Sequence, residues 1–249
     1  MNEPRANQAR KADLRVVITR NADDCVSWAT TLRARGIGSV SLPCIETESI
    51  DSIALRTSFT DSLVTADWLV FTSQRGARAA ARLIDRPLPA RLRIAVVGRT
   101  TAERARALFG HVDFIAKEPT ADGLANELAE FLQHRHAAVA LALAENAGNV
   151  LSEKLQAAGQ KVQRFDVYRT VPVAPQSRRR PLAEIGAQTV FLASPSAVLG
   201  FVNQIEVDAD ARLVSIGPTT TAAIRRAGLP VFAQATTPSL DGLLAAIEE

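Results

Sequence analysis

An internal repeat constrains the fold of this chain more than any other feature. Residues 94–102, IAVVGRTTA, return as residues 213–221, LVSIGPTTT, and residues 119–124, PTADGL, return as residues 238–243, PSLDGL. The register is constant across this stretch, with Gly98 matching Gly217 and Pro119 matching Pro238. Residues 69–73, LVFTS, and 190–194, VFLAS, match at a similar spacing. We therefore predict two similar domains facing each other across a cleft, a common place for a small-molecule site.

Composition excludes several classes of protein. With 249 residues, 47% of them hydrophobic, the chain is long enough to bury one large core or two small ones. Cys25 and Cys44 fit no metal-ligand spacing, and two cysteines make no disulfide framework. Residues 1–14 lack the apolar segment of a secretory signal, and the apolar run 137–144 is too short to span a membrane. We expect a cytoplasmic protein without a membrane segment.

The net charge of +3 is spread along the chain, and its one dense run, Arg178-Arg179-Arg180, lies in a predicted loop. A nucleic-acid groove usually adds stacking aromatic residues to a basic stripe. Aromatic residues make up only 5% of this chain. We therefore expect an acidic small molecule as the partner, and no nucleic acid.

Short apolar runs alternate with helical patterns along the chain. Predicted strands are 15–19, 68–71, 93–97, 138–142, 189–192 and 213–216, and predicted helices include 26–35, 77–84, 102–109, 121–133, 150–158, 197–202, 221–227 and 239–247. Nearly continuous apolar strands alternating with helices are typical of parallel sheets covered on both faces. The predicted fold class is α/β, with two similar parallel-sheet domains.

One extended segment in each half breaks this alternation. Residues 40–47 and 164–171 occupy equivalent places after a Leu-x-x-x-Gly helix end. If both cross between the domains, they form a two-stranded linker. The predicted domains are then 1–42 with 171–249, and 46–166.

Four strand-to-helix turns share one chemical character: residues 71–76, 97–101, 192–196 and 216–220. Their Ser and Thr residues can cap the following helices, and free amides at a helix start favour anions. Capping alone explains any single Ser or Thr. Four such turns at the carboxyl ends of parallel strands favour a shared binding site.

Common catalytic motifs are missing from the sequence. It has no GxxxxGK[ST], GxGxxG, HExxH or GxSxG motif. Asp23 and Asp24 are expected to open a helix, and His111, His134 and His136 to lie on the surface.

The ordered set of motifs resembles the uroporphyrinogen-III synthase family. It includes residues 17–20 (VITR), 71–73 (FTS), 97–102 (VGRTTA), 167–170 (VYRT) and 216–220 (IGPTT), and the likeness runs from about residue 14 to the C-terminus. The resemblance implies two flavodoxin-like α/β domains joined by a pair of antiparallel strands. One domain would contain both chain ends and the other the middle.

The resemblance also implies a reaction. Members cyclise hydroxymethylbilane, a linear tetrapyrrole with eight carboxylates, to uroporphyrinogen III with inversion of ring D, and use no metal or organic cofactor. Loss of the terminal hydroxyl as water gives an azafulvene cation, which closes through a spiro intermediate. Holding the flexible substrate in the reactive arrangement could supply much of the catalysis.

Site residues follow from the matched positions. Tyr168, the only tyrosine in the chain, matches the family's proposed proton donor to the departing hydroxyl, although it could simply be packed. The predicted substrate-binding residues are Ser73, Arg75, Ser194 and Thr220, followed by Thr72, Thr219, Ser196 and Arg20. Their polar groups, above all the Arg75 guanidinium, suit carboxylates.

The chain departs from the family pattern in two places. Residues 145–149, ENAGN, lack the basic residue common there in the family, and Ala193 stands where the repeat predicts Thr. A catalytically inactive two-lobed binding or regulatory protein for an acidic ligand is therefore kept as the alternative, and a sugar-phosphate enzyme as a third possibility. We expect a monomer that could receive substrate directly from the bilane-producing enzyme.

Overall fold

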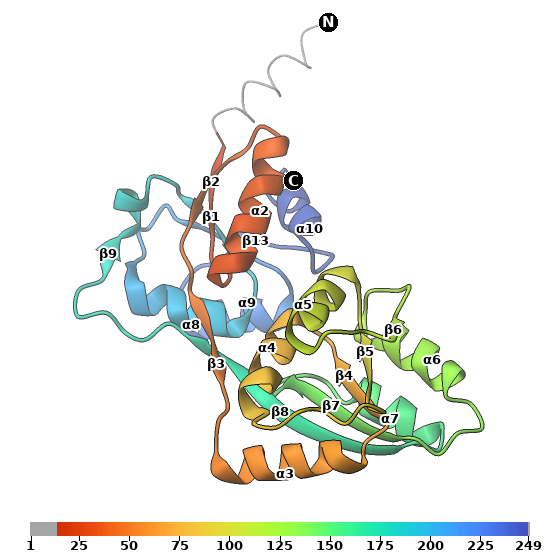
Figure 1. The fold of residues 1–249 in the computed structure, drawn as a ribbon. Coiled ribbons are helices and arrows are strands. Elements are labelled where there is room, and N and C mark those ends of the chain that lie inside the picture. The colour runs from red at the N-terminus through yellow and green to blue at the C-terminus, as the bar shows by residue number, and fades with distance from the viewer. Residues whose placement is uncertain (1–13, 249) are drawn as a thin grey trace, which may run out of the picture. The chain divides into compact units, whose positions relative to one another are not determined.

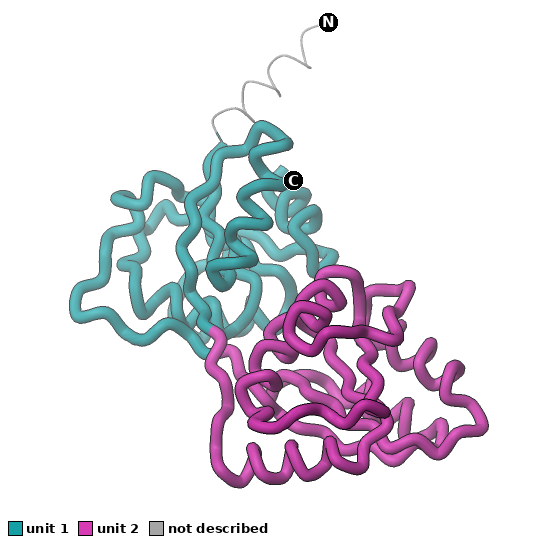
Figure 2. Tube along the Cα trace, viewed as in Figure 1, with its two compact units in different colours: residues 1–46, 171–249 teal, residues 47–170 magenta. Residues whose placement is uncertain are grey.

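A computed structural model describes residues 14–248. The prediction that residues 1–14 carry no secretory signal therefore concerns residues that lie, except for residue 14, outside the described part. The chain divides into two compact units (Figure 2). Unit 1 comprises the chain up to residue 46 and from residue 171 on, and unit 2 comprises residues 47–170.

Unit 1 is built on a five-stranded parallel sheet with the order β13-β12-β10-β1-β2. Strands β1, β2 and β13 of this sheet are labelled in Figure 1. Its strands are β1 (Arg15–Ile18), β2 (Gly38–Ser41), β10 (Thr189–Leu192), β12 (Arg212–Ser215) and β13 (Ala233–Gln234). Counted along the chain within the unit, this order is 2-1-3-4-5 from the β2 edge, which is the flavodoxin-like order.

Helices cover both faces of the unit 1 sheet. Helices α8 (Pro195–Gln204) and α9 (Pro218–Arg226) bury Phe201 and Ile224 against Val17 and Leu213. Helices α2 (Ala22–Ala34) and α10 (Leu240–Ala245) pack on the other face. Outside the sheet lie a 3-10 helix (Leu182–Ile185) and the short paired strands β9 (Arg180–Pro181) and β11 (Ile205–Glu206). Side chains that alternate along each strand therefore pack into two separate apolar cores, one on each face of the sheet.

Unit 2 repeats this architecture with a permuted chain order. Five of its strands pair in parallel in the order β8-β7-β4-β5-β6, and β3 joins the sheet beside β8. The strands are β3 (Ile45–Ser49), β4 (Trp68–Phe71), β5 (Arg93–Val96), β6 (Phe114–Ile115), β7 (Ala138–Ala144) and β8 (Lys161–Pro172). Strands β7 and β8 come last in unit 2 but occupy the sheet positions that β1 and β2 occupy in unit 1.

The unit 2 helices also lie on both faces of their sheet. Helices α3 (Ile53–Thr65), α4 (Gln74–Leu83) and α5 (Arg99–Phe109) pack on the face that buries Phe71 and Val96. Helices α6 (Ala121–Phe131) and α7 (Val150–Ala157) pack on the face that buries Val70 and Leu141.

Strands β3 and β8 carry the chain between the units. The Ile50 amide donates to the Val167 carbonyl at 3.0 Å, and the Val173 amide donates to the Cys44 carbonyl at 2.9 Å. Residue numbers rise along one strand as they fall along the other, so the pair is antiparallel. The predicted extended segment 40–47 is interrupted at residues 42–44, between β2 and β3.

The structure corrects several predicted helix boundaries. Helices predicted from Ala77, Ala102, Ala197 and Thr221 begin two or three residues earlier, because the preceding Ser or Gly is the N-cap. Helix α3 was not predicted, since its buried face includes the polar Thr60 and Ser62 and so dilutes the apolar pattern. Among residues 14–248, no helix is both long enough and apolar enough to cross a membrane.

Candidate active site

Each of the two large sheets has one pair of neighbouring strands whose following helices lie on opposite faces of the sheet. In unit 2, α4 follows β4 onto one face and α7 follows β7 onto the other. In unit 1 the neighbouring strands β10 and β1 diverge in the same way, toward α8 and α2. Ligands of open parallel sheets bind beyond the carboxyl ends of such strand pairs. Ser73 and Ser194 lie at these two places, directly after β4 and β10 in sequence.

In unit 2 the structure brings Ser73 and Tyr168 together. The Ser73 Oγ and the Tyr168 hydroxyl oxygen lie 2.9 Å apart, a hydrogen-bond distance. Ser73 is the N-cap of α4, and Tyr168 is a buried residue near the end of β8 with 7% of its surface exposed. Two predicted site residues, far apart in sequence, thus form one hydroxyl pair.

A bulge in β8 gives Tyr168 its direction. Leu143 of β7 pairs with Asp166, but Ala144 pairs with Tyr168, so β8 holds one extra residue at this point. The extra residue changes the alternation, and Tyr168 joins Val167 in the core on the face covered by α4. Bulges commonly redirect side chains next to active sites.

The helix cap leaves Ser73 able to bond to Tyr168. The Gly76 amide donates to the Ser73 Oγ at 3.0 Å. The Ser73 oxygen keeps a second acceptor position as well as its hydrogen, so either hydroxyl of the pair can be the donor. The start of α4, the positive end of its dipole, lies beside this hydroxyl pair.

Helix α4 approaches β7 closely because residue 76 is glycine. A Cβ atom at Gly76 would lie 2.8 Å from the Ala142 carbonyl oxygen and 3.7 Å from the Tyr168 ring. Thr72 and Arg75 flank the Ser73 cap and are partly buried. Thr72, Ser73 and Arg75, the predicted binding residues of unit 2, therefore lie close together in sequence around the start of α4.

In unit 1, Ser194 occupies the equivalent cap. Its Oγ accepts from the Ala197 amide at 3.1 Å, and Ser196 lies partly buried in the same helical turn. Arg20, just after β1, has partners within its own unit. Its guanidinium donates to Asp24 at 2.8 and 3.1 Å and lies 4.8 Å from the centre of the Trp28 ring.

The two glycine turns differ from the serine turns. Gly98 and Gly217 are the N-caps of α5 and α9 and supply no side-chain acceptor, so their threonines lie inside the helices and are not caps. Thr219 is exposed. Thr220 is 1% exposed, and its hydroxyl oxygen is buried without a hydrogen-bond partner among the described residues. A buried unpaired hydroxyl is costly, which marks Thr220 as a position that a polar ligand group could satisfy.

Comparisons with known proteins identify the family. The family model described as uroporphyrinogen-III synthase HemD matches residues 26–245. The chain belongs to the uroporphyrinogen-III synthase family. The predicted family is confirmed, and with it the predicted enzyme class.

Curated relatives support this assignment, and solved structures share the fold. The chain is 28% identical over 244 residues to the chloroplastic uroporphyrinogen-III synthase of Oryza sativa subsp. japonica, covering 94% of this chain and 80% of that protein. The Synechococcus elongatus uroporphyrinogen-III synthase is 25% identical, with 94% of both chains covered.

Uroporphyrinogen-III synthetase from Helicobacter pylori has a similar fold, with a TM-score of 0.56 at 16% identity, covering 94% of this chain and 98% of that chain. A mutant uroporphyrinogen III synthase from Thermus thermophilus gives a TM-score of 0.52 at 17% identity, covering 94% of this chain and 97% of that chain. These structures confirm the predicted α/β fold class.

Arg164 was not identified from the sequence, although it contacts the loop that departs from the synthase pattern. Residues 145–149 contain no base, but Arg164 of β8 reaches this loop. Its guanidinium donates to the carbonyls of Ala144, Glu145 and Gly148, to Asn149 Oδ1 and to Asp166. With five such bonds, Arg164 holds the loop in place and has little remaining capacity to bind an anion.

The described residues offer no group for a metal ion. Among residues 14–248 there is no cluster of three or more His, Cys, Asp or Glu side chains with the geometry of a metal site. The two cysteines are buried free thiols. Hydroxyls, helix starts and guanidinium groups are thus the chemistry that the candidate site residues supply.

Proposed function

We propose that this chain cyclises hydroxymethylbilane to uroporphyrinogen III, inverting ring D and releasing water. Family membership supports the reaction, and the hydroxyl pair of Ser73 and Tyr168 is the structural observation that carries the proposal. The pair lies near the carboxyl ends of the strands where α/β proteins of this topology bind ligands.

Tyr168 is the proposed proton donor to the departing hydroxyl. Its O–H bond breaks, the substrate C–O bond breaks, and the hydroxyl leaves as water while an azafulvene cation remains. The Ser73 hydroxyl then donates to the phenolate, and the start of α4 stabilises its charge. The proton that the substrate loses when ring closure is complete restores Tyr168, so the step is balanced.

The remaining predicted residues are proposed to hold the acetate and propionate groups of the substrate. In unit 2 these are Thr72, Ser73 and Arg75, around the start of α4. In unit 1 they are Arg20, Ser194, Ser196, Thr219 and Thr220. Two features support this role most directly. The Thr220 hydroxyl has no hydrogen-bond partner among the described residues, and the start of α9 has no side-chain cap.

Three further features are proposed for the enzyme. It acts as a monomer, and it receives its unstable substrate by transient contact with the bilane-producing enzyme. We place it in the cytoplasm. The free thiols of Cys25 and Cys44 support a reducing compartment.

The test is isomer analysis of the porphyrin formed from freshly generated hydroxymethylbilane. Purified protein should give predominantly isomer III, whereas a reaction without protein should give isomer I. Formation of isomer I alone, at the rate of the protein-free control and with protein shown to be folded by circular dichroism, would overturn the proposal. Tetrapyrrole binding without turnover would then favour the non-catalytic binding protein.

A further inference from the structure

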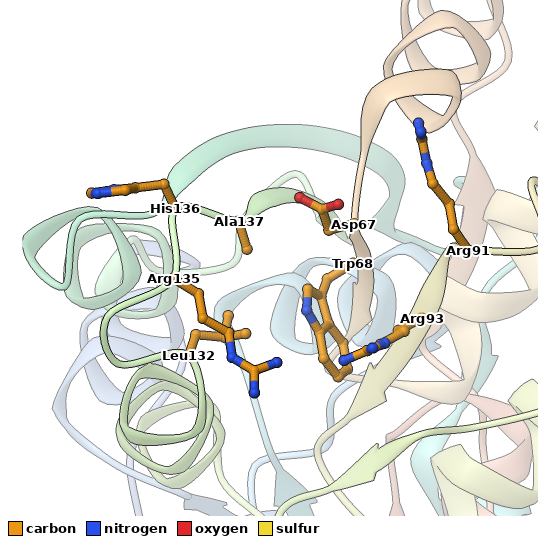
Figure 3. Close-up of a pocket in the computed structure, with 8 residues that line it drawn as sticks. All are labelled: Asp67, Trp68, Arg91, Arg93, Leu132, Arg135, His136 and Ala137. Carbon is orange, nitrogen blue, oxygen red and sulfur yellow. The ribbon is translucent and has the colours of Figure 1, made fainter.

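A pocket lies at the opposite end of the unit 2 strands from Ser73. It borders the amino ends of β4 and β5 and the residues just before β7, and its volume is about 330 Å³ (Figure 3). Six of its lining residues carry a ring, an acid or a base: Asp67, Trp68, Arg91, Arg93, Arg135 and His136. Since β4 runs from Trp68 to Phe71 and Ser73 follows its far end, the pocket is separate from the candidate active site.

Aromatic rings hold two guanidinium groups at this pocket. The Arg93 guanidinium lies 5.6 Å from the centre of the Trp68 ring, and the Trp68 ring lies 5.8 Å from the Phe131 ring. The Arg135 guanidinium lies 5.5 Å from the Phe131 ring. In Figure 3, Arg135 extends toward Trp68 from one side while Arg93 lies against the indole. Contact with a ring face leaves the N–H groups at the edge of each guanidinium available.

Neither Arg93 nor Arg135 is neutralised within residues 14–248. No ion pair or side-chain hydrogen bond joins either guanidinium to another described residue. The one carboxylate lining the pocket, Asp67, accepts from the Ala138 amide at 2.8 Å. Arg91 donates to the Val64 carbonyl, and in Figure 3 its side chain extends away from the other labelled residues.

The repeat shows that this charge is particular to unit 2. Arg212 of unit 1 corresponds to Arg93, and its ring partner is Phe232 at 5.2 Å. In the paired strands, however, Arg93 lies beside Trp68, whereas Arg212 lies beside Thr189. Asp210 stands at the repeat position of Arg91, so unit 1 has an acid where unit 2 has a base. Sheet architecture therefore does not require the basic pocket.

We propose that this pocket binds a small molecule carrying two or more oxyanion groups, carboxylate or phosphate. The two guanidinium groups lie on the pocket, their N–H donors bond to no other described residue, and they match such groups in geometry and charge. The volume is at the lower end of the range for small-molecule sites. This inference stands independently of the proposed reaction.

Trp68 supplies the readout for the test. The chain has two tryptophans, so Trp28→Phe leaves Trp68 as the only indole. In this background, citrate and pyrophosphate are titrated at constant ionic strength, with tryptophan fluorescence and titration calorimetry as parallel measurements. We expect saturable binding of at least one of the two probes, and the tighter one identifies carboxylate or phosphate as the preferred group.

Arginine variants test whether binding occurs at this pocket. Arg93→Gln and Arg135→Gln should each weaken binding at least tenfold, whereas Arg212→Gln, the matched change in unit 1, should leave it unchanged. The proposal is overturned if neither probe binds saturably by either measurement. It is also overturned if the Arg212→Gln variant and the pocket variants bind equally well, because binding would then reflect general positive charge.

Discussion

The hydroxyl oxygens of Ser73 and Tyr168 lie 2.9 Å apart, and the same Ser73 oxygen accepts the Gly76 amide at the start of α4. One serine thus links a helix cap to the only tyrosine of the chain. This arrangement fixes the position of the phenol and gives its conjugate base a hydrogen-bond donor. Because a buried phenol needs such a partner in any role, a change in rate is what distinguishes a catalytic Tyr168 from a packed one.

Tyr168→Phe removes the proposed proton donor and keeps the ring. We expect the rate of isomer III formation to fall by roughly 100-fold, a typical loss for a general acid. The ring remains buried in the unit 2 core, so the fold should be kept, and the free energy of unfolding should fall by only about 1 kcal/mol from loss of the bond to Ser73. Initial rates with fresh hydroxymethylbilane test this, and an unchanged rate would remove Tyr168 from the mechanism.

Ser73→Ala and Ser194→Ala form a matched pair of cap deletions. Each should lower the free energy of unfolding by about 1 kcal/mol, because each helix loses its side-chain cap. Ser73→Ala should cost about 1 kcal/mol more, since it also loses the bond to Tyr168. Urea unfolding of both variants measures the difference.

A double-mutant cycle separates the two roles of Ser73. If Ser73 acts through the phenol, Ser73→Ala should slow the wild-type enzyme but should have much less effect on the rate in the Tyr168→Phe background. Fully additive effects on the rate would show that Ser73 and Tyr168 act independently.

Gly76→Ala tests the close approach of α4 to β7. Alanine normally stabilises a helix relative to glycine, but here the new Cβ would lie 2.8 Å from the Ala142 carbonyl oxygen. We expect a loss of about 1–3 kcal/mol in the free energy of unfolding. Gly148→Ala is the control, because a Cβ at that position would meet no atom within 4 Å. Equal stability of the two variants would contradict the packing described for Gly76.

The sequence predicted what depends on local pattern. Strands such as Trp68–Phe71 and Thr189–Leu192 are short apolar runs whose limits match the predictions. The turns at Ser73 and Ser194 were predicted from capping chemistry, and the structure shows both caps. Local chemistry is sufficient in these cases because the partner atom is three residues away.

Features that depend on long-range pairing were not predictable. The bulge that directs Tyr168 arises from the register between β7 and β8, and no local signal marks it. Arg164 was missed for the same reason, since the loop it holds lies about fifteen to twenty residues earlier in the chain. The burial of Thr220 likewise follows from how α9 packs and is absent from its local sequence.

The buried Cys25 thiol should make stability fall at alkaline pH. Burial raises its pKa from 9.0 to about 11, and burial raises the pKa of Cys44 as well. Below pH 8 the thiols are protonated in both states and contribute nothing. Between about pH 9 and 11 the unfolded chain loses the Cys25 proton while the folded chain keeps it, so the free energy of unfolding falls with rising pH.

Urea unfolding across this pH range, with a reductant present, measures the effect. The Cys25 contribution is roughly 1.4 kcal/mol per pH unit between the two pKa values. Cys25→Ala should therefore show a visibly flatter decline than the wild-type chain. Identical slopes would mean that the folded protein ionises this thiol as readily as the unfolded chain does.

Thr220 and Thr221 are adjacent buried threonines with opposite expected responses to valine. The Thr221 hydroxyl donates to Gln234 Oε1 at 2.6 Å and lies 2.6 Å from the Ser215 hydroxyl, whereas the Thr220 hydroxyl has no partner among the described residues. Thr221→Val breaks the hydrogen bonds that link Ser215, Thr221 and Gln234 and should destabilise the protein by about 1–3 kcal/mol. Thr220→Val removes an unpaired buried hydroxyl and should stabilise the free protein by up to about 1 kcal/mol.

Thr220→Val should at the same time raise KM for hydroxymethylbilane, because the protein would lose the hydroxyl proposed to bind a polar group of the substrate. A gain in stability together with weaker substrate binding is the pattern expected of a residue kept for its ligand. Unfolding measurements and steady-state kinetics on the same preparation test both parts. If Thr220→Val and Thr221→Val destabilise the protein equally, the Thr220 hydroxyl has a partner in the free protein, and its assignment to the substrate loses its basis.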